Sequence, residues 1–279
     1  MKKSMITATA MTATLLTATA QGNYQQFGSA DKPTILIVHG FPGNATDWLV
    51  IAKSLSEHYR VIVPDLIGFG NNAQKNLPFD QVWLSSQAEN MFNILQKENV
   101  DSLSIIAHDF GVPIAMTLTE TFSGKVSGLI ITAGNTLSDP PLNPVMRAVP
   151  KPVIGGFAKG FLFSKFSINM MRTMGTKKGK IYPIKNTKTE RQALKTIFAT
   201  ALEDMKGYFL PVEKIAEKSD VKTLIIWGDK DPFFPVSHAE RMKVKMKNAE
   251  LIVYSGVGHY AFIEESNKFV NDVIKFLAL

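Results

Sequence analysis

The stretch from Ala107 to Gly111, with the sequence AHDFG, constrains this chain more than any other part of it. It follows the short apolar run 103–106, which is typical of a buried strand, and precedes apolar residues at helical spacing over 112–122. A tight turn from a strand into a helix requires small residues on either side of its tip, and Ala107 and Gly111 supply them. The pattern therefore predicts a sharp turn that presents the side chain of Asp109 at the end of a strand.

An aspartate at such a turn favours one kind of chemistry. Attack by a carboxylate on acyl carbon leaves a high-energy anhydride, whereas attack on saturated carbon leaves an alkyl ester that water can then cleave. Epoxides and alkyl halides meet this requirement because each has a strained or departing group on saturated carbon. The N-terminus of the following helix would keep Asp109 ionised. The alternative is an aspartate that simply caps an ordinary helix.

A second glycine-containing turn follows another apolar run. Residues 34–38 precede the sequence HGFPG at 39–43. A turn at the carboxyl end of a central strand is where open α/β sheets bind ligands. We expect the backbone N–H groups of Phe41 and Phe110 to form an oxyanion hole there. A plain Gly-Pro turn is the alternative interpretation.

Two more apolar runs are followed by an acid and a histidine. The run 224–227 is followed by Asp231, and the run 251–254 is followed by His259, so the chain order is nucleophile, acid, base. In this scheme His259 activates the water that attacks the ester, and Asp231 orients the imidazole and stabilises its cation. Taken singly, His259 is more simply a loop histidine, but the motifs together predict a catalytic site.

These motifs resemble those of α/β-hydrolase-fold enzymes in the epoxide hydrolase and haloalkane dehalogenase branch. The resemblance covers about residues 14–279, and no G-x-S-x-G sequence offers a rival serine nucleophile. It implies an α/β fold with a mostly parallel, doubly wound sheet and an inserted helical cap, and it places the acid on Asp231 rather than Asp229. The chain departs from the family pattern after GFG, where residues 71–74 replace a short serine-containing stretch. The motifs that carry the resemblance are HGFPG (39–43), PDLIGFG (64–70), AHDFG (107–111), WGDKDPFFP (227–235) and GVGHY (256–260).

The reaction that this resemblance implies depends on what stabilises the leaving group. Dehalogenases of the family donate side-chain N–H groups to the halide from positions that hold Phe110 and Phe41 here, and phenylalanine has no donor. Epoxide hydrolases use tyrosine hydroxyls of the cap, where this chain has Tyr182 and Tyr208. We therefore expect hydrolysis of an epoxide to a diol. Packing or surface roles are the alternative for both tyrosines, and the alternative functions are hydrolysis of an alkyl halide and non-catalytic ligand binding.

The order of strand and helix patterns predicts one core domain with an insertion. Strands alternate with helical patterns up to about residue 133 and again from about 221, which is typical of a mostly parallel sheet. We expect a core domain of residues 1–136 and 213–279 and a helical cap at 137–212. The cap holds 13 of the 31 Lys and Arg residues but only 4 of the 24 Asp and Glu residues. Such a cap would steer anionic substrates or meet an acidic surface, although a solvated face is the simpler explanation.

The composition also limits cofactors and partners. The chain has no cysteine, and its five histidines lack the H-x-x-x-H spacing of a metal site. We expect no cofactor, no metal, no nucleic-acid partner and no membrane span; a small apolar organic molecule and water are the expected substrates. Lys2, Lys3 and the stretch 6–20 are compatible with a secretory signal that ends near Ala20. The family resemblance implies a hairpin that ends at Tyr24 to Gly28, and cleavage at Ala20 would remove its first strand. We expect an uncleaved cytoplasmic protein, with export as the alternative, and make no prediction of its oligomeric state.

Overall fold

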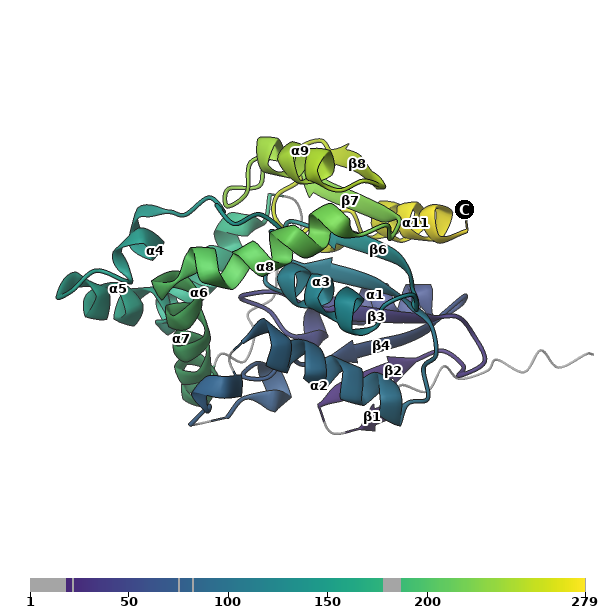
Figure 1. Ribbon diagram of the computed structural model, residues 1–279, viewed down its shortest axis with the longest axis horizontal. Coiled ribbons are helices and arrows are strands. Elements are labelled where there is room, and N and C mark those ends of the chain that lie inside the picture. Colours follow the sequence, from purple (N-terminus) through teal and green to yellow (C-terminus); the bar gives the residue numbers. More distant parts are fainter. Residues whose placement is uncertain (1–18, 22, 75, 82, 178–186, 279) are drawn as a thin grey trace, which may run out of the picture.

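The computed structural model describes residues 19–21, 23–74, 76–81, 83–177 and 187–278. In these residues eight strands form one sheet in the order β1-β2-β4-β3-β5-β6-β7-β8 (Figure 1). Strand β2 pairs antiparallel with both β1 and β4. The other neighbouring pairs, from β4 through β3 to β8 in sheet order, are parallel. The prediction of a mostly parallel sheet is thus confirmed. The strands are β1 (Thr19–Gln21), β2 (Tyr24–Phe27), β3 (Thr34–Val38), β4 (Arg60–Pro64), β5 (Leu103–His108), β6 (Val126–Thr132), β7 (Thr223–Gly228) and β8 (Ala249–Tyr254).

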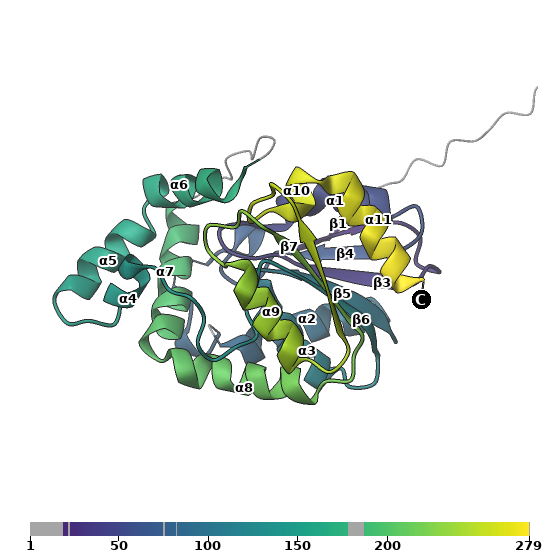
Figure 2. The ribbon, with the colours of Figure 1, turned by 90° about the horizontal axis from the view of Figure 1, so that it is seen from above.

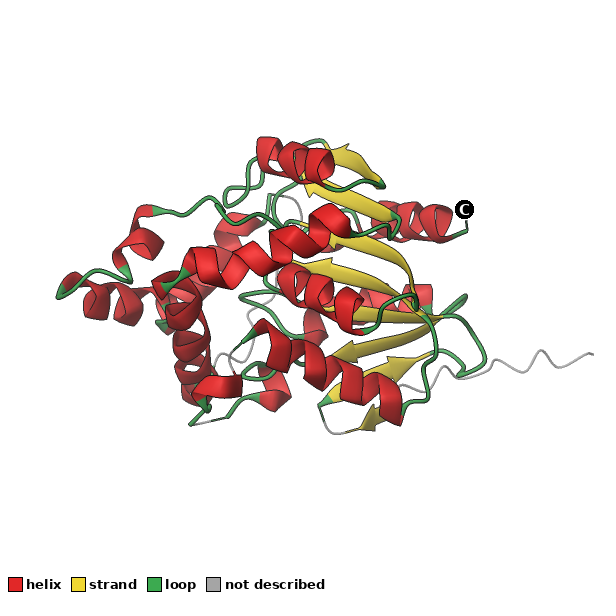
Figure 3. Ribbon diagram, viewed as in Figure 1, coloured by secondary structure: helices red, strands yellow, loops and turns green. Residues whose placement is uncertain are grey.

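Helices cover both faces of the sheet, with the strands as a layer between them (Figure 3). Side chains alternate between the two faces along each strand: Ile35 and Ile37 of β3 join one buried cluster, and Leu36 and Val38 join the other. Both faces are buried, which is why these strands are continuous apolar runs in the sequence. One face packs against α1 (Leu49–Leu55) and α11 (Ser266–Leu277), and the other against α2 (Leu84–Lys97), α3 (Gly111–Thr121) and α9 (Val236–Lys245). The short helices are η1 (Ala45–Trp48), η2 (Gly70–Asn72), η3 (Phe79–Gln81) and α10 (Ala261–Glu264).

Between β6 and β7 the chain leaves the sheet; we call residues 133–222 the β6–β7 segment. Figure 2 shows α4 to α7 beyond one end of the strands, whereas α8 runs back beside α3. The expected cap boundary at residue 212 falls inside α8, because this helix continues through Pro211 to Lys218. The division into a core and a cap domain remains a prediction. The described helices of this segment are α4 (Pro144–Ala148), α5 (Ile154–Leu162), α6 (Lys165–Gly175), α7 (Lys188–Glu203) and α8 (Met205–Lys218).

Two expectations fall wholly or partly outside the described residues. One is the candidate signal sequence, of which the structure describes only β1, paired antiparallel with β2. The other is Tyr182, which lies in the gap between 177 and 187. Within the part of the chain that the structure describes, none of the helices has the length and hydropathy needed to cross a bilayer.

Candidate active site

Asp109 lies at the turn between β5 and α3, where the AHDFG pattern predicts it. Its φ is +49°, in the left-handed region that non-glycine residues rarely adopt and that aspartate tolerates better than most. The neighbouring glycines make room for this turn. A Cβ atom on Gly111 would lie 2.4 Å from the carbonyl oxygen of Val38, and one on Gly40 would lie 2.5 Å from the Cβ of Asp109. The loops after β3 and β5 can therefore approach each other only because these positions lack side chains.

The two oxygens of the Asp109 carboxylate face different groups. Oδ1 accepts a hydrogen bond from the backbone N–H of Phe41 at 2.8 Å. Oδ2 lies 3.6 Å from Nε2 of His259. One oxygen is thus held by a backbone donor and the other faces an imidazole, which is the arrangement that a nucleophile with a separate base requires.

His259 is fixed by the predicted acid. Its Nδ1 donates to Oδ2 of Asp231 at 2.9 Å, and both side chains are almost fully buried. The other oxygen of Asp231 accepts the backbone N–H groups of Phe233 at 2.8 Å and Phe234 at 3.1 Å. Asp229, the other candidate acid, accepts instead from the backbone of Gly256 at 2.6 Å. The carboxylate in contact with the histidine is therefore that of Asp231.

The charges around His259 determine its protonation. Burial lowers the pKa of His259, but the negative charge of Asp231, the hydrogen bonds to both aspartates and the charge of Asp109 outweigh it and raise this pKa to about 10. At neutral pH the imidazole is a cation between two carboxylates. His108, which directly precedes Asp109, behaves in the opposite way: burial above all lowers its pKa to about 3. His108 stays neutral and donates from Nε2 to the carbonyl of His259 at 3.2 Å.

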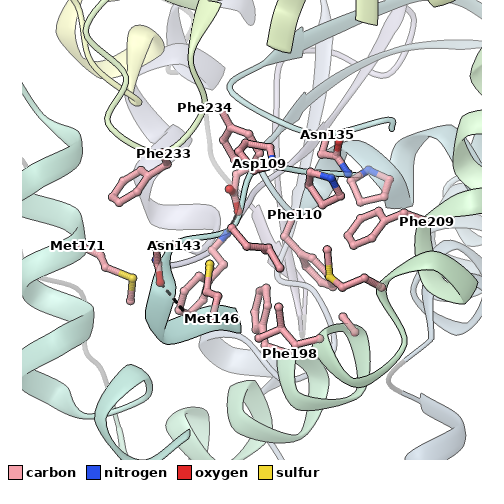
Figure 4. A pocket seen from close by; sticks show the side chains of 18 of the residues that line it. Asp109, Phe110, Asn135, Asn143, Met146, Met171, Phe198, Phe209, Phe233 and Phe234 are labelled. Atoms are coloured by element: carbon pink, nitrogen blue, oxygen red, sulfur yellow. Dashed lines mark hydrogen bonds between the residues drawn. The ribbon is translucent and has the colours of Figure 1, made fainter. Parts of the chain in front are cut away.

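Asp109 and His259 open into an apolar pocket of about 320 Å³ (Figure 4). Phe110, Phe233 and Phe234 line it from the loops at the strand ends. Helices of the β6–β7 segment supply Met146, Met171, Phe198 and Phe209, all of which Figure 4 shows around Asp109. A pocket of this size and polarity fits a small apolar molecule. The polar side chains among its described lining residues are Asp109, Asn135, Asn143 and His259.

Tyr208 is absent from the described lining of this pocket, which corrects the expectation that it protonates the leaving group. It is 2% exposed, and its ring stacks on Trp83 with 5.5 Å between the ring centroids. Its neighbour Phe209 lines the pocket. Consecutive residues on a helix point about 100° apart, and here Phe209 faces the pocket while Tyr208 faces Trp83. Burial raises the pKa of the Tyr208 hydroxyl, as expected for a side chain packed in the core.

Contacts between α6 and the catalytic loops were not predicted. The guanidinium of Arg172 donates to the carbonyl of Pro42 at 2.6 Å and to both carboxylate oxygens of Asp47. The carbonyl of Gly175 accepts the backbone N–H of His259 at 2.7 Å. One helix of the β6–β7 segment therefore holds both the loop of Phe41 and the loop of His259. Residues this far apart in the chain carry no spacing signal that would have revealed the contacts.

A third contact of the segment involves Glu190. Its Oε1 accepts the backbone N–H of Gly70, in the PDLIGFG loop, at 3.1 Å. Burial is the main cause that raises the pKa of this carboxyl. Thr187 caps the same helix by accepting the N–H of Glu190, which gives α7 a defined start beside the core.

The described residues contain no group of three or more His, Cys, Asp or Glu side chains arranged to hold a metal ion.

The sheet, the Asp109 turn and the loops that bring Asp231 to His259 define the class: an α/β hydrolase. The model of the α/β hydrolase fold family matches residues 33–266, and the chain belongs to that family. An uncharacterised protein of Mycobacterium tuberculosis strain H37Rv is 27% identical over 282 residues, which cover 95% of this chain and 81% of that protein. A cis-3-alkyl-4-alkyloxetan-2-one decarboxylase of Xanthomonas campestris is 22% identical, over 91% of both proteins.

Solved structures show the same fold. The 2-hydroxy-6-oxo-6-phenylhexa-2,4-dienoate hydrolase of Rhodococcus sp. strain RHA1 superposes with a TM-score of 0.77 at 17% sequence identity. The superposition covers 92% of this chain and 94% of that one. The similarity establishes the architecture, and the reaction has to be argued from the site.

Proposed function

We propose that this α/β hydrolase cleaves its substrate at saturated carbon through a covalent alkyl ester on Asp109, with hydrolysis of an epoxide to a diol as the reaction. The observation that carries the proposal is the pair of contacts at the Asp109 carboxylate. Phe41 donates to Oδ1, and His259 faces Oδ2 at 3.6 Å. A carboxylate in this position opens an epoxide without passing through an anhydride.

In the first half-reaction, Oδ2 of Asp109 attacks a carbon of the epoxide ring. The ring C–O bond breaks, its electron pair goes to oxygen, and this oxygen needs a proton. Among the described lining residues, the imidazolium of His259 is the acid suited to this step, because its pKa of about 10 keeps it protonated in the free enzyme. Proton transfer leaves His259 neutral. Tyr182, outside the described residues, remains the candidate donor from the sequence.

In the second half-reaction, the ester has removed the negative charge of Asp109. That charge is one of the causes that raise the pKa of His259, so esterification favours the neutral imidazole that can accept a proton from water. Water then adds to the ester carbon, and negative charge develops on Oδ1. The Phe41 N–H already donates to this oxygen, and we place the N–H of Phe110 as the second donor.

Collapse of this intermediate releases the diol. The departing alkoxide takes the proton from His259, whose cation Asp231 stabilises until then. The acid proton of Asp109 returns to His259 and restores the starting ion pair. The full cycle consumes one epoxide and one water.

The decisive experiment measures the intact mass of the His259→Gln variant after incubation with a panel of epoxides and haloalkanes. We expect a mass increase equal to a whole epoxide, because the ester forms and lacks its base. The matched control is Asp109→Asn in the same background, which should form no adduct. Turnover of an epoxide by the wild type without any adduct in His259→Gln would refute the proposal. An adduct that lacks the halogen of a haloalkane would favour alkyl-halide hydrolysis instead.

A four-membered lactone is the second candidate substrate. The observation that favours it is the scarcity of acids among the described lining side chains, since attack at the ring carbon of such a lactone releases a carboxylate that needs no proton. The Xanthomonas relative is named for decarboxylation of a dialkyl oxetan-2-one. Adding such a lactone to the panel separates the two reactions, because loss of CO2 from it has no counterpart with an epoxide.

A further inference from the structure

We propose that the tip of the β6–β7 segment docks on the surface of an anionic lipid bilayer. The tip is formed by α5 and the start of α6, and Figures 1 and 2 both show α5 at the end of the molecule remote from α11. This inference concerns a surface outside the pocket and does not depend on the reaction proposed above. The surface, called the tip patch here, consists of Val153, Ile154, Phe157, Phe161 and Phe166.

Large apolar side chains are unusually exposed in the tip patch. Val153 is 85% exposed, Phe157 80% and Phe166 69%, and the other two members are about half exposed. Isolated exposed apolar residues are normal on proteins, but five large ones within residues 153–166 mark an interaction surface. Three members lie at helical spacing on α5, at positions 154, 157 and 161. Together they form the outer face of that helix.

The inner face of α5 is already occupied. Gly155, Ala158 and Leu162 are buried against the rest of the segment. The outer residues therefore are not needed for the helix to pack on the protein, and polar side chains there would give an ordinary amphipathic surface helix.

The backbone at Val153 is a separate observation at the same place. This residue has φ +65° and ψ −60°, although a β-branched side chain disfavours positive φ. With this backbone conformation the valine side chain points outward and is 85% exposed, and it does not pack into the interior. Strained backbone of this kind is found mainly where a side chain has a function.

Charge identifies the partner. Residues 140–189 contain no Asp or Glu but ten Lys and Arg residues. Lys151 and Lys165 are exposed at the tip, whereas Lys159 of α5 pairs with Glu203 of α7. A second copy of the chain docked through the same patch would bring two basic surfaces together. An anionic bilayer instead pairs the lysines with lipid headgroups while the phenylalanines enter the headgroup boundary.

Docking there places the pocket wall next to an apolar reservoir. The helices that flank the patch also line the pocket, through Met146 of α4 and Met171 of α6. A membrane-dissolved apolar substrate would thus be concentrated on the segment that encloses the nucleophile. This is surface association, in keeping with the lack of a spanning helix among the described residues.

The test is flotation with vesicles of phosphatidylcholine mixed with phosphatidylglycerol, compared with pure phosphatidylcholine. We expect the wild type to float with the anionic vesicles, and binding to weaken in high salt. Phe157→Ser/Phe166→Ser should weaken binding at least about tenfold. The matched control is Val50→Ser/Val244→Ser, which removes residues that are 66% and 86% exposed outside the segment.

Thermal unfolding and turnover of a water-soluble substrate should be unchanged in the Phe157→Ser/Phe166→Ser variant, since neither residue lines the pocket. A second variant, Lys151→Glu/Lys165→Glu, should lose preference for anionic vesicles while keeping the apolar patch. The proposal is overturned if the wild type does not bind anionic vesicles, or if the tip variant binds as well as the control. It is equally overturned if the wild type is a dimer that the tip variant converts to a monomer.

Discussion

Arg172 and Asp47 form an ion pair with a shortest N–O distance of 2.7 Å, and their side chains are only 2% and 11% exposed. The same guanidinium donates to the carbonyl of Pro42, the residue after the donor that holds Asp109. Asp47 neighbours the stacked pair of Trp48 and Phe262, whose ring centroids are 3.7 Å apart. The pair therefore connects a helix of the β6–β7 segment to the surroundings of Asp109 and to the core.

Replacing Arg172 with Met should destabilise the protein and reduce activity together. Removing one member of a buried ion pair leaves an uncompensated charge, here on Asp47, and costs about 3–5 kcal/mol. The free energy of unfolding from denaturant titration and kcat/KM measure the two effects. Adding Asp47→Asn to Arg172→Met should recover part of the stability, because the orphaned charge is removed. An additive double variant would contradict this coupling.

Replacing Asp109 with Asn should abolish turnover and keep the fold. Asparagine tolerates the left-handed backbone, and its amide oxygen can still accept from Phe41, but an amide is not a nucleophile. We expect activity to fall by at least about a thousandfold, as for loss of a nucleophile elsewhere. Asp109→Val is the contrasting variant and should lower the thermal midpoint, because its β-branched side chain resists φ +49°. Equal midpoints for the two variants would disprove the backbone argument.

The stability of the wild type should fall as the pH rises from neutral through 10. The pKa of His259 is raised from 6.5 to about 10, so the folded state holds this proton more tightly than the unfolded state. The resulting stabilisation is complete below pH 6.5 and is lost as the pH rises through the folded pKa. His259→Gln removes this contribution. The difference in the free energy of unfolding between the wild type and this variant should therefore shrink as the pH rises from 6.5 to 10. A difference that stays constant over this window would show that the imidazole is neutral in the free enzyme.

Replacing Tyr208 with Phe should leave kcat unchanged. The Tyr208 ring stacks on Trp83, and the residue is absent from the described pocket lining, so its hydroxyl has no route to a leaving group there. Phe209→Ala is the matched variant on the same helix and should change KM, because Phe209 lines the pocket. A large fall in kcat for Tyr208→Phe with little effect of Phe209→Ala would restore the tyrosine as an acid.

The sequence predicted most of what lies at the strand ends. A parallel sheet aligns the carboxyl ends of its strands, so Asp109, Asp231 and His259 were expected at one edge once their strands were recognised. The adjacent residues 208 and 209 show where this reasoning stops. Both lie in a clearly helical pattern, but which of them faces the site depends on how α8 packs against α3, and that rotation is not encoded in local spacing.

Arg172 illustrates the same limit for charge. Counted in the sequence, it is one of many basic residues in the segment, whereas in the structure it is buried against Asp47, 125 positions earlier in the chain. The expected cap boundary at residue 212 likewise falls inside a helix, because α8 continues through Pro211 to Lys218. Packing against the core decides both cases.

The hydrogen bond from the backbone of His259 to the carbonyl of Gly175 restricts how this enzyme exchanges substrate for product. Movement of α6 as a rigid lid would break that hydrogen bond and also the contacts of Arg172 with Asp47 and Pro42. The loops of His259 and Phe41 would then lose their support at the same time. The contacts of α6 therefore favour exchange with α6 in place, by rearrangement of flexible lining side chains such as Met146 and Met205. In kinetic terms, His259 and Phe41 keep their positions around Asp109 while substrate enters and product leaves.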